Sequence, residues 1–389
     1  TGEHRLFHES LVPHIEPPMH PEALEMLARD EILTSRPKLA MGHLEQAAQI
    51  DTRIDLVLAL EHLAKTYSDP DAAHAKKVQE LITQHPSYAP ELKAILSQIL
   101  RERGQHATST EERDKLFQSA QRALIDVIGD SLYDAEPRYM LCELYLDQNK
   151  PTQAREACED AKKTDAVSMY GQLAMARLHI ELGEIVQAKK ILLPLDATHP
   201  DYFPLARTLI ALYIAEGALG AASKRINTLK QVYTDHPMLP LIEGRLAFAQ
   251  GRYADALSFF QQAHNQSSSS VETAIFLAYS RVRMGETEQP EIEDVLRSHL
   301  AHPLLGGYAW LALGELRRRQ GRHKDAEENL EQAIKLLDSP GISSWFKIEA
   351  HTQRALSWQA QHGWQHARVQ RYLEQAEALD EDTHADLKY

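Results

Sequence analysis

The chain has only two cysteines among its 389 residues, Cys142 and Cys158. Two cysteines are too few for a disulfide framework, and a separation of 16 residues excludes a CxxC metal or redox motif. Both fall where small residues recur along the chain, so we predict buried, unreactive thiols. Facing helices would also allow the two to bridge in an oxidising compartment, and the sequence leaves that alternative open.

Motifs for catalysis and long apolar runs are missing as well. The sequence contains no GxGxxG, P-loop, GxSxG, HExxH or acidic calcium loop. No stretch approaches the roughly 18 consecutive apolar residues that would span a bilayer. We therefore predict a protein that is not an enzyme, holds no cofactor or metal, and has no membrane span within this chain.

Positive charge is also in short supply. Lys and Arg number 42 against 56 Asp and Glu, a formal net charge of −14. This balance repels phosphate backbones and argues against nucleic acid as a direct partner, unless basic residues are strongly segregated. The 43% hydrophobic and 25% charged content is typical of a folded soluble protein.

What the sequence does contain is a repeat, clearest in residues 304–338. Apolar residues at helical spacing precede Gly321, and a second set follows it, so the segment predicts two amphipathic helices joined by a glycine turn. The recurring residues of this unit are Trp310, Leu313, Gly314, Gly321, Ala326, Leu330 and Ala333. Two helices cannot bury both apolar stripes alone, so the unit implies neighbours stacked on either side.

The turn position recurs along the chain. Gly183, Gly217, Gly251, Gly285 and Gly321 follow one another at spacings of 34, 34, 34 and 36 residues. The same position falls on Asn149, Gly104, Asp69 and Ser35 toward the N-terminus and on Gly363 toward the C-terminus. Because Asn and Asp are also favoured in turns, the positions predict ten helix hairpins.

This period and these small residues resemble the tetratricopeptide repeat (TPR) family over residues 21–389. The resemblance implies an all-α fold, a right-handed α-α superhelix or solenoid of about ten hairpins. Residues 1–20, with several prolines and no period, are predicted to form a linker or docking arm.

Three places depart from the period. Gly104 and Asn149 lie 45 residues apart, which predicts an insertion as a longer loop over 104–113, with a longer second helix after it and a subdomain seam near 104–114. Pro290 predicts a short, late helix from about residue 290 to 300. The 42 residues between Gly321 and Gly363 predict extra chain near 337–341.

Histidine is abundant, with 20 residues. His299/His302 and His362/His366 have spacings that would hold one edge of a metal site, but no carboxylate or cysteine completes either pair. His20, His85, His199, His236 and His302 each precede a proline, mostly at repeat ends. We therefore favour a structural role in turns over metal binding.

In the TPR fold the first helix of each hairpin lines the concave surface. Carried over by position, the resemblance implies a partner-binding face of Tyr139, Tyr170, Leu173, Arg177, Arg207, Leu241, Arg245, Phe248, Ile275 and Tyr279, with Glu143, Leu146, Ile180, Ile214 and Val282 among them. Its arginines recur in successive repeats between apolar residues, a composition typical of protein-binding hot spots. The alternative is that they bridge to carboxylates of adjacent repeats.

The carboxylate clamp of chaperone-binding relatives is not reproduced, because its positions hold Glu25 and Arg29, Ala59 and Leu63, or Leu173 and Arg177. We predict a scaffold or adaptor that holds a protein or peptide segment in its groove. A regulatory arm of a signalling or transcription regulator and a periplasmic module for polysaccharide export or envelope assembly are the alternatives. The compartment stays open, with the cytoplasm slightly favoured over the periplasm, and self-association also stays open.

Overall fold

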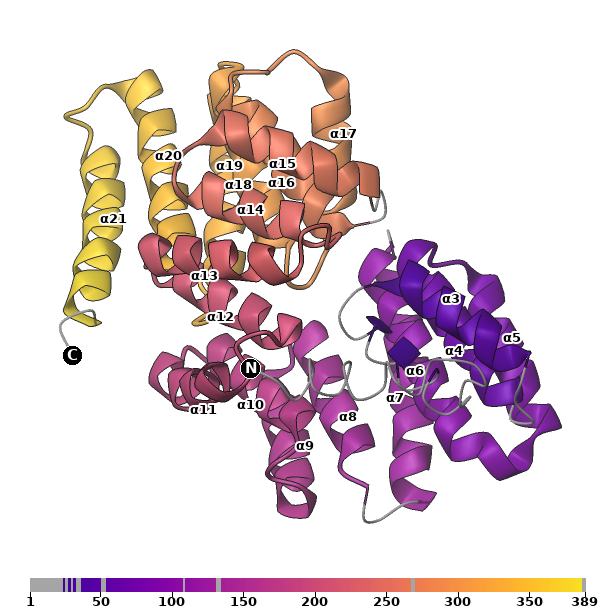
Figure 1. Cartoon of the computed structure of the whole chain (residues 1–389). Coiled ribbons are helices and arrows are strands. Elements are labelled where there is room, and N and C mark those ends of the chain that lie inside the picture. Colours follow the sequence, from indigo (N-terminus) through magenta and orange to yellow (C-terminus); the bar gives the residue numbers. More distant parts are fainter. Residues whose placement is uncertain are drawn as a thin grey trace. The chain divides into compact units, whose positions relative to one another are not determined.

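The computed structural model describes residues 36–49, 54–107, 109–130, 134–266 and 270–386, together with residues 24, 27, 28, 31 and 32. Across these residues the chain forms 19 α-helices and one short 3-10 helix, and no strand (Figure 1). The predicted all-α fold is confirmed. The predicted arm, residues 1–20, lies outside the described residues.

The chain divides into two compact units. Unit 1 consists of Thr1–His179, Ile185–Thr208 and Leu229–Met238, and unit 2 of Ile180–Glu184, Leu209–Thr228 and Leu239–Tyr389. Residues 104–114 lie within unit 1. The seam predicted there stays a prediction.

Unit 1 contains successive antiparallel helices (Figure 1). They are α3 (Pro37–Ala48), α4 (Ile54–Ser68), α5 (Ala72–Gln84), the 3-10 helix η2 (Pro86–Tyr88), α6 (Ala89–His106), α7 (Thr110–Asp130), α8 (Glu136–Asp147), α9 (Pro151–Thr164), most of α10 (Met169–Glu181) and α11 (Ile185–Thr198). Helices α12 (Phe203–Ala215) and α13 (Leu219–Val232) contribute residues to both units.

Unit 2 continues the same alternation. Its helices are α14 (Leu239–Ala249), α15 (Tyr253–Gln266), α16 (Val271–Arg283), α17 (Pro290–Ser298), α18 (Gly306–Arg319), α19 (His323–Leu337), α20 (Ser344–His362) and α21 (Ala367–Asp386). Helix α17 is the short helix that Pro290 predicted. In the hairpins of both units, α4, α6, α8, α10, α14, α16, α18 and α20 are the first helices.

The turns of the hairpins have the backbone conformation that their residues predict. Asn149 and six glycines, 183, 217, 251, 285, 321 and 363, adopt positive φ angles between 55° and 91°. This left-handed conformation is easy for glycine and tolerated by asparagine, and it ends the first helix of each hairpin. The predicted turn positions from Asn149 to Gly363 are therefore confirmed.

Gly104 was assigned wrongly. It lies inside α6, and a Cβ atom built on it would approach the ring of Phe117 in α7 to 2.5 Å. Gly244 and Gly314 make the same close approach to Phe260 and Leu330 of their own second helices. Gly104 thus belongs to the position where two helices cross. The extra residues of this repeat lengthen α6 and α7 to 18 and 21 residues instead of forming a long loop.

Cys142 and Cys158 form a disulfide that joins α8 to α9. Both residues are fully buried. The prediction of two separate thiols was wrong, because the small-residue positions of a hairpin are where its two helices approach most closely.

Candidate protein-interaction surface

The first helices of unit 1 carry a network of charged side chains, which we call the inner network: Arg101, Gln105, Glu143, Asp147, Tyr170 and Arg177. At its centre is Asp147, which is 2% exposed. Its carboxylate accepts hydrogen bonds from Gln105 of α6 at 2.6 Å and from Arg177 of α10 at 2.6 Å, and it also pairs with Arg101 of α6. Glu143, one turn earlier on α8, pairs with Arg101 at 2.7 Å and accepts a hydrogen bond from Tyr170 at 2.9 Å.

Electrostatics within the inner network favour the ionised carboxylate. Burial opposes the charge on Asp147, but Arg101 and Arg177 outweigh that effect and hold the pKa of Asp147 well below its usual range. Burial and the negative charge of Glu143 together raise the pKa of Tyr170. The network therefore ties α6, α8 and α10 together around an ionised Asp147.

Beside the inner network lies a cleft of about 390 Å³, which we call the inner groove. It runs across α4, α6 and α8, with one residue of α7. Its lining is Ile32, Leu60, Leu63, Pro90, Glu91, Ala94, Ile95, Gln98, Val127, Asp134, Glu136, Pro137 and Met140. Most of these side chains are apolar, and the charged ones are all carboxylates. A cleft of this size accommodates a few side chains of a bound segment.

The corresponding face of unit 2 is covered by its own chain. Trp345 and Phe346, in the first turn of α20, pack on that face. The ring centroid of Phe346 lies 4.6 Å from that of Tyr308, 6.1 Å from that of Phe276 and 6.4 Å from that of Phe248. Trp345 lies 6.0 Å from Phe248. We call this pair of residues the α20 cover.

A charged anchor holds the α20 cover in place. Arg283 of α16 pairs with Glu349 of α20 at 2.7 Å and with Glu315 of α18 at 3.4 Å. Its guanidinium also lies 5.6 Å from the ring centroid of Trp345, close enough for a cation–π contact. Aromatic packing and ion pairs thus fasten α20 to α16 and α18.

Five of the predicted partner-binding residues lie in unit 1. Tyr139 is buried, and its hydroxyl donates to the backbone carbonyl of Asp165 at 2.6 Å. Tyr170, Leu173 and Arg177 are half-buried along α10, and Arg207 is exposed on α12. The three residues of α10 lie on one helix, and two of them enter the inner network.

The other five lie in unit 2. Leu241, Phe248, Ile275 and Tyr279 are buried, and Arg245 is partly exposed. Phe248 stacks within the aromatic cluster that the α20 cover completes, and its ring lies 4.9 Å from that of Tyr279. In the described structure these four side chains therefore contribute to packing.

Two of the three predicted arginines bridge adjacent repeats. Arg177 reaches back to Asp147 of the preceding first helix, and Arg245 lies 3.3 Å from Glu272 of the following one. The bridging alternative thus accounts for both contacts. Arg207 is exposed, its Nη1 lies 3.4 Å from the sulfur of Met238, and its charge also acts on Glu102 of α6.

Sequence reasoning missed the residues that α6 contributes to the inner face. Gly244 and Gly314 stand seven residues before their turn glycines, Gly251 and Gly321. Had Gly104 been given that position, the offsets that gave Tyr170, Leu173 and Arg177 in repeat five would have given Gln98, Arg101 and Gln105. Gln98 lines the inner groove, and the other two belong to the inner network.

Histidines act in the turns, as predicted for the His–Pro pairs that show side-chain contacts. The Nδ1 atom of His302 accepts hydrogen bonds from the backbone N–H groups of Leu304 and Leu305, and that of His236 accepts one from Met238. The rings of His362 and His366 lie 4.5 Å and 5.2 Å from that of Trp358 in tilted arrangements, and Nδ1 of His366 accepts a hydrogen bond from the backbone N–H of Arg368. Among the residues described, no three His, Cys, Asp or Glu side chains are grouped as metal ligands.

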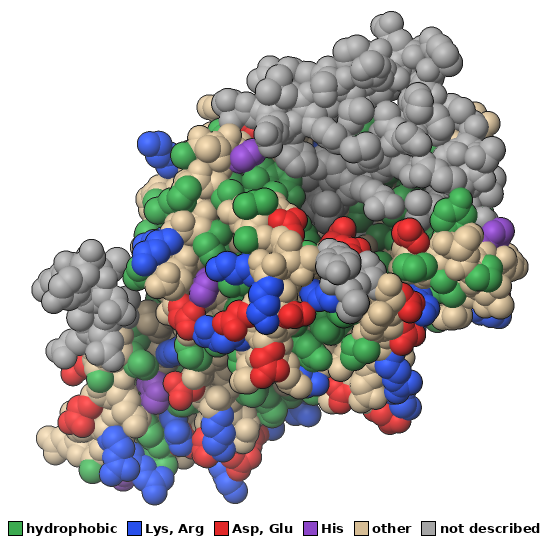
Figure 2. Space-filling view, turned by 90° about the horizontal axis from the view of Figure 1, so that it is seen from below, with side chains coloured by type: hydrophobic (Ala, Val, Ile, Leu, Met, Phe, Trp, Pro, Cys, Tyr) green, Lys and Arg blue, Asp and Glu red, His purple; other side chains and the backbone are tan. Residues whose placement is uncertain are grey.

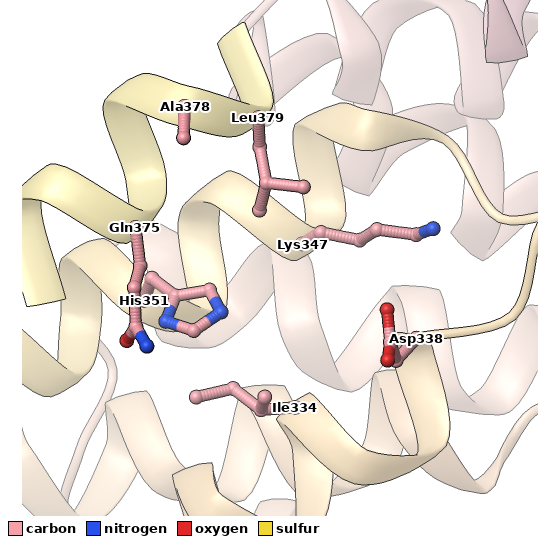
Figure 3. Close-up of a pocket in the computed structure, with 7 residues that line it drawn as sticks. All are labelled: Ile334, Asp338, Lys347, His351, Gln375, Ala378 and Leu379. Carbon is pink, nitrogen blue, oxygen red and sulfur yellow. The ribbon is translucent and has the colours of Figure 1, made fainter. Parts of the chain in front are cut away.

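A second cleft, of about 380 Å³, lies between α19, α20 and α21 (Figure 3). Figure 3 shows the ring of His351 between Gln375 and Ile334, with Lys347 and Asp338 toward the other side and Leu379 pointing into the cleft. Burial, reinforced by Arg354, lowers the pKa of His351, so its imidazole is neutral at pH 7. None of the seven lining residues is a Ser, Thr or Cys nucleophile.

Charged side chains of both signs are intermixed on the face in Figure 2. Blue Lys and Arg side chains alternate there with red Asp and Glu among the coloured residues. For the helices that the structure describes, none combines the length and apolar character that crossing a bilayer requires.

Comparison with known proteins supports the fold. No family model matches the chain. It is similar to the TPR repeat-containing protein YpiA of Bacillus subtilis strain 168, with 24% identity over 187 residues. That stretch is 46% of this chain and 43% of YpiA, so the similarity spans less than half of the relative's length.

Two solved structures of human IFIT1 have a similar fold. The dimer with m7Gppp-AAAA matches with a TM-score of 0.55 and 13% identity, covering 97% of this chain and 90% of that chain. The dimer with PPP-AAAA matches with a TM-score of 0.52 and 12% identity, covering 96% and 94%. Identities this low show the fold alone. With the repeat-containing relative, they confirm the predicted resemblance: the chain is a TPR-type α-solenoid.

Proposed function

We propose that the protein is a non-enzymatic scaffold that binds a segment of a partner protein along the first helices of unit 1. The observation that carries this proposal is the inner groove, a cleft of about 390 Å³ on the face where the TPR fold presents its partner-binding surface. Unit 2 supports the choice by contrast, because its own α20 cover packs on the equivalent face.

Of the residues predicted from the sequence, those with accessible surface are the candidates for contact. In unit 1 these are Tyr170, Leu173, Arg177 and Arg207; in unit 2, Arg245 keeps partial exposure. Of the three arginines, Arg207 has the most exposed side chain. Buried Tyr139 would support this surface from beneath, whereas Leu241, Phe248, Ile275 and Tyr279 belong to the packing of unit 2.

Photo-crosslinking in the native cell tests the proposal. A benzoylphenylalanine placed at Gln98 in the inner groove or at Leu173 on α10 should capture the same partner segment, which mass spectrometry identifies. Gln79, exposed on the second helix α5, is the matched control. Adducts that form equally well from Gln79, or none from the two first-helix positions, would contradict binding on this face.

A protein partner is favoured over nucleic acid by charge. IFIT1 was solved with m7Gppp-AAAA, so the fold by itself leaves nucleic acid open. Here the charged residues of the inner groove are all carboxylates, which repel phosphate.

The disulfide favours one alternative, a module of the periplasm or envelope. Disulfides persist in oxidising compartments and are rare where glutathione keeps thiols reduced. Fractionation of native cells, with thiol labelling of Cys142 and Cys158 before any reduction, tests this placement. Recovery of the protein in the cytoplasm with both thiols labelled would contradict it.

A further inference from the structure

Side chains of the inner groove divide into an apolar floor and an acidic rim. Leu60 and Leu63 of α4, Ile95 of α6 and Met140 of α8 make up much of the floor. Gln98 also lines the groove, with its amide nitrogen 4.0 Å from the sulfur of Met140. Such a surface favours an apolar side chain of a bound segment, because that side chain leaves water when it enters.

The rim consists of three carboxylates. Glu91 lies in the first turn of α6, Glu136 in the first turn of α8, and Asp134 just before α8. All three are exposed. Oδ1 of Asp134 accepts a hydrogen bond from the backbone N–H of Glu136 at 3.1 Å.

Two basic residues close in sequence each pair with a carboxylate of a second helix. Lys93 pairs with Asp126 of α7 at 3.3 Å, and Arg138 pairs with Asp160 of α9 at 3.0 Å. Arg138 also donates a hydrogen bond to the backbone carbonyl of Asp134, so its guanidinium lies beside the rim. The charged side chains that line the groove itself are all carboxylates.

From this arrangement we propose that the inner groove takes a partner segment in which lysine or arginine stands next to a large apolar residue. The proposal rests on the proposed function, since it specifies the chemistry of the segment bound at that same site. Its apolar side chain enters the floor between α4, α6 and α8, and its cation meets Glu91, Asp134 or Glu136. This chemistry is opposite to that of a carboxylate-tail clamp, in which the repeat supplies the cations.

The rim carboxylates also have a role in helix stability that does not involve a ligand. Acidic residues in the first turn of a helix interact favourably with the helix dipole, whether or not a ligand binds. Under that account, Glu91→Gln and Glu136→Gln would lower thermal stability slightly and leave ligand preference unchanged. Under our proposal they change which peptides bind.

Selection from a random 12-residue phage-displayed peptide library against the full chain provides the test. Each round includes counter-selection on Ala94→Trp, which fills the groove at a half-buried lining position. We expect the enriched peptides to carry Lys or Arg beside Leu, Ile, Met or Phe. Their synthetic versions should bind about 2–5-fold more weakly to Glu91→Gln or Glu136→Gln, in the range of exposed ion pairs.

Two further variants keep the outcome decisive. Gln98→Lys puts a positive charge in the groove with little steric change and should weaken the same peptides, which guards against misfolding of Ala94→Trp. Glu111→Gln removes an exposed carboxylate of α7 that pairs with Lys115, and it should leave binding unchanged.

The possible results separate this inference from the proposed function. Groove-dependent peptides without an excess of Lys or Arg would overturn the inferred chemistry and leave the scaffold function standing. Peptides insensitive to Ala94→Trp and Gln98→Lys, or no enrichment at all, would overturn both. Binding of single-stranded oligoadenylate that Ala94→Trp abolishes would assign the groove to nucleic acid and overturn both as well.

Discussion

At the carboxylate of Asp147, side chains from two neighbouring first helices meet. Arg101 and Gln105 approach from α6 and Arg177 from α10, so one buried charge on α8 orients three polar side chains. Removing it leaves two arginines without their shared partner. Such broken pairs are costly because the remaining charge keeps its desolvation without compensation.

We predict that Asp147→Asn lowers the free energy of unfolding by about 3 kcal/mol, at the lower end for buried pairs because Arg101 and Arg177 keep some exposure. Asp255→Asn is the control, because Asp255 and its partner Arg252 both have exposed side chains. Loss of that exposed ion pair should lower the free energy of unfolding by less than about 1 kcal/mol. Urea denaturation at pH 7 measures both. Equal losses in the two variants would contradict the buried network.

The same residue predicts a pH dependence. An aspartate in the unfolded chain has a pKa of about 3.9, whereas the pKa of Asp147 in the folded protein is lower. The unfolded chain therefore takes up this proton first, and the stabilisation present above that pH is lost as the pH falls toward the folded pKa. Urea midpoints at pH 7, 4 and 3 should decline more steeply for wild type than for Asp147→Asn. Parallel declines would remove Asp147 as the cause.

Two glycines predict opposite effects of the same substitution. A Cβ on Gly314 would lie 2.6 Å from Leu330, whereas one on exposed Gly42 of α3 meets nothing within 4 Å. Gly314→Ala should destabilise by about 1–3 kcal/mol through overpacking. Gly42→Ala should stabilise by about 0.5–1 kcal/mol, because alanine loses less backbone entropy in a helix. Melting temperatures that move in the same direction would contradict this helix packing.

Among the elements, the α8–α9 hairpin is the one with a covalent link. We predict that reduction, or Cys142→Ala, destabilises it by about 3 kcal/mol, from the entropy of closing a loop of this length. Alkylation of the unfolded, unreduced protein followed by intact mass measurement shows whether the bond is present. Uptake of two alkyl groups without reductant would contradict it, and Cys158→Ala should match Cys142→Ala in stability.

Prediction from the sequence succeeded for elements whose cause is local. Glycine at 251, 285 or 321 ends a helix because of its own backbone freedom, so the turns and the short α17 followed from single residues. Gly104 failed, because glycine also serves where helices cross and the sequence does not say which use applies. The α20 cover could not be predicted, because Phe346 packs on Phe248, nearly 100 residues earlier in the chain. In unit 2, four of the ten predicted binding residues are buried in packing, and Phe248 is the one that the α20 cover contacts directly.

For the whole molecule, repeat architecture predicts uneven stability. Each hairpin is stabilised by its neighbours, and α21 ends the described chain with a small apolar cluster of Ala355, Val369 and Tyr372. We predict that the amides of α21 exchange with solvent faster than those of α14, α16 and α18 in the same unit. Hydrogen exchange with mass spectrometry measures this, and protection of α21 equal to that of α18 would contradict it.

The α20 cover also lowers the apparent affinity of any ligand that binds the face beneath it. A tethered segment competes at an effective concentration on the order of millimolar, which an external segment in the cell rarely matches. If closing the cover is favourable by about 2 kcal/mol, that face is accessible roughly 3% of the time, and the apparent affinity of a competitor falls about 30-fold. The two units thus consist of similar helix hairpins but differ in how accessible their first-helix faces are to a ligand. Only a partner able to displace Trp345 and Phe346 would also bind the face in unit 2.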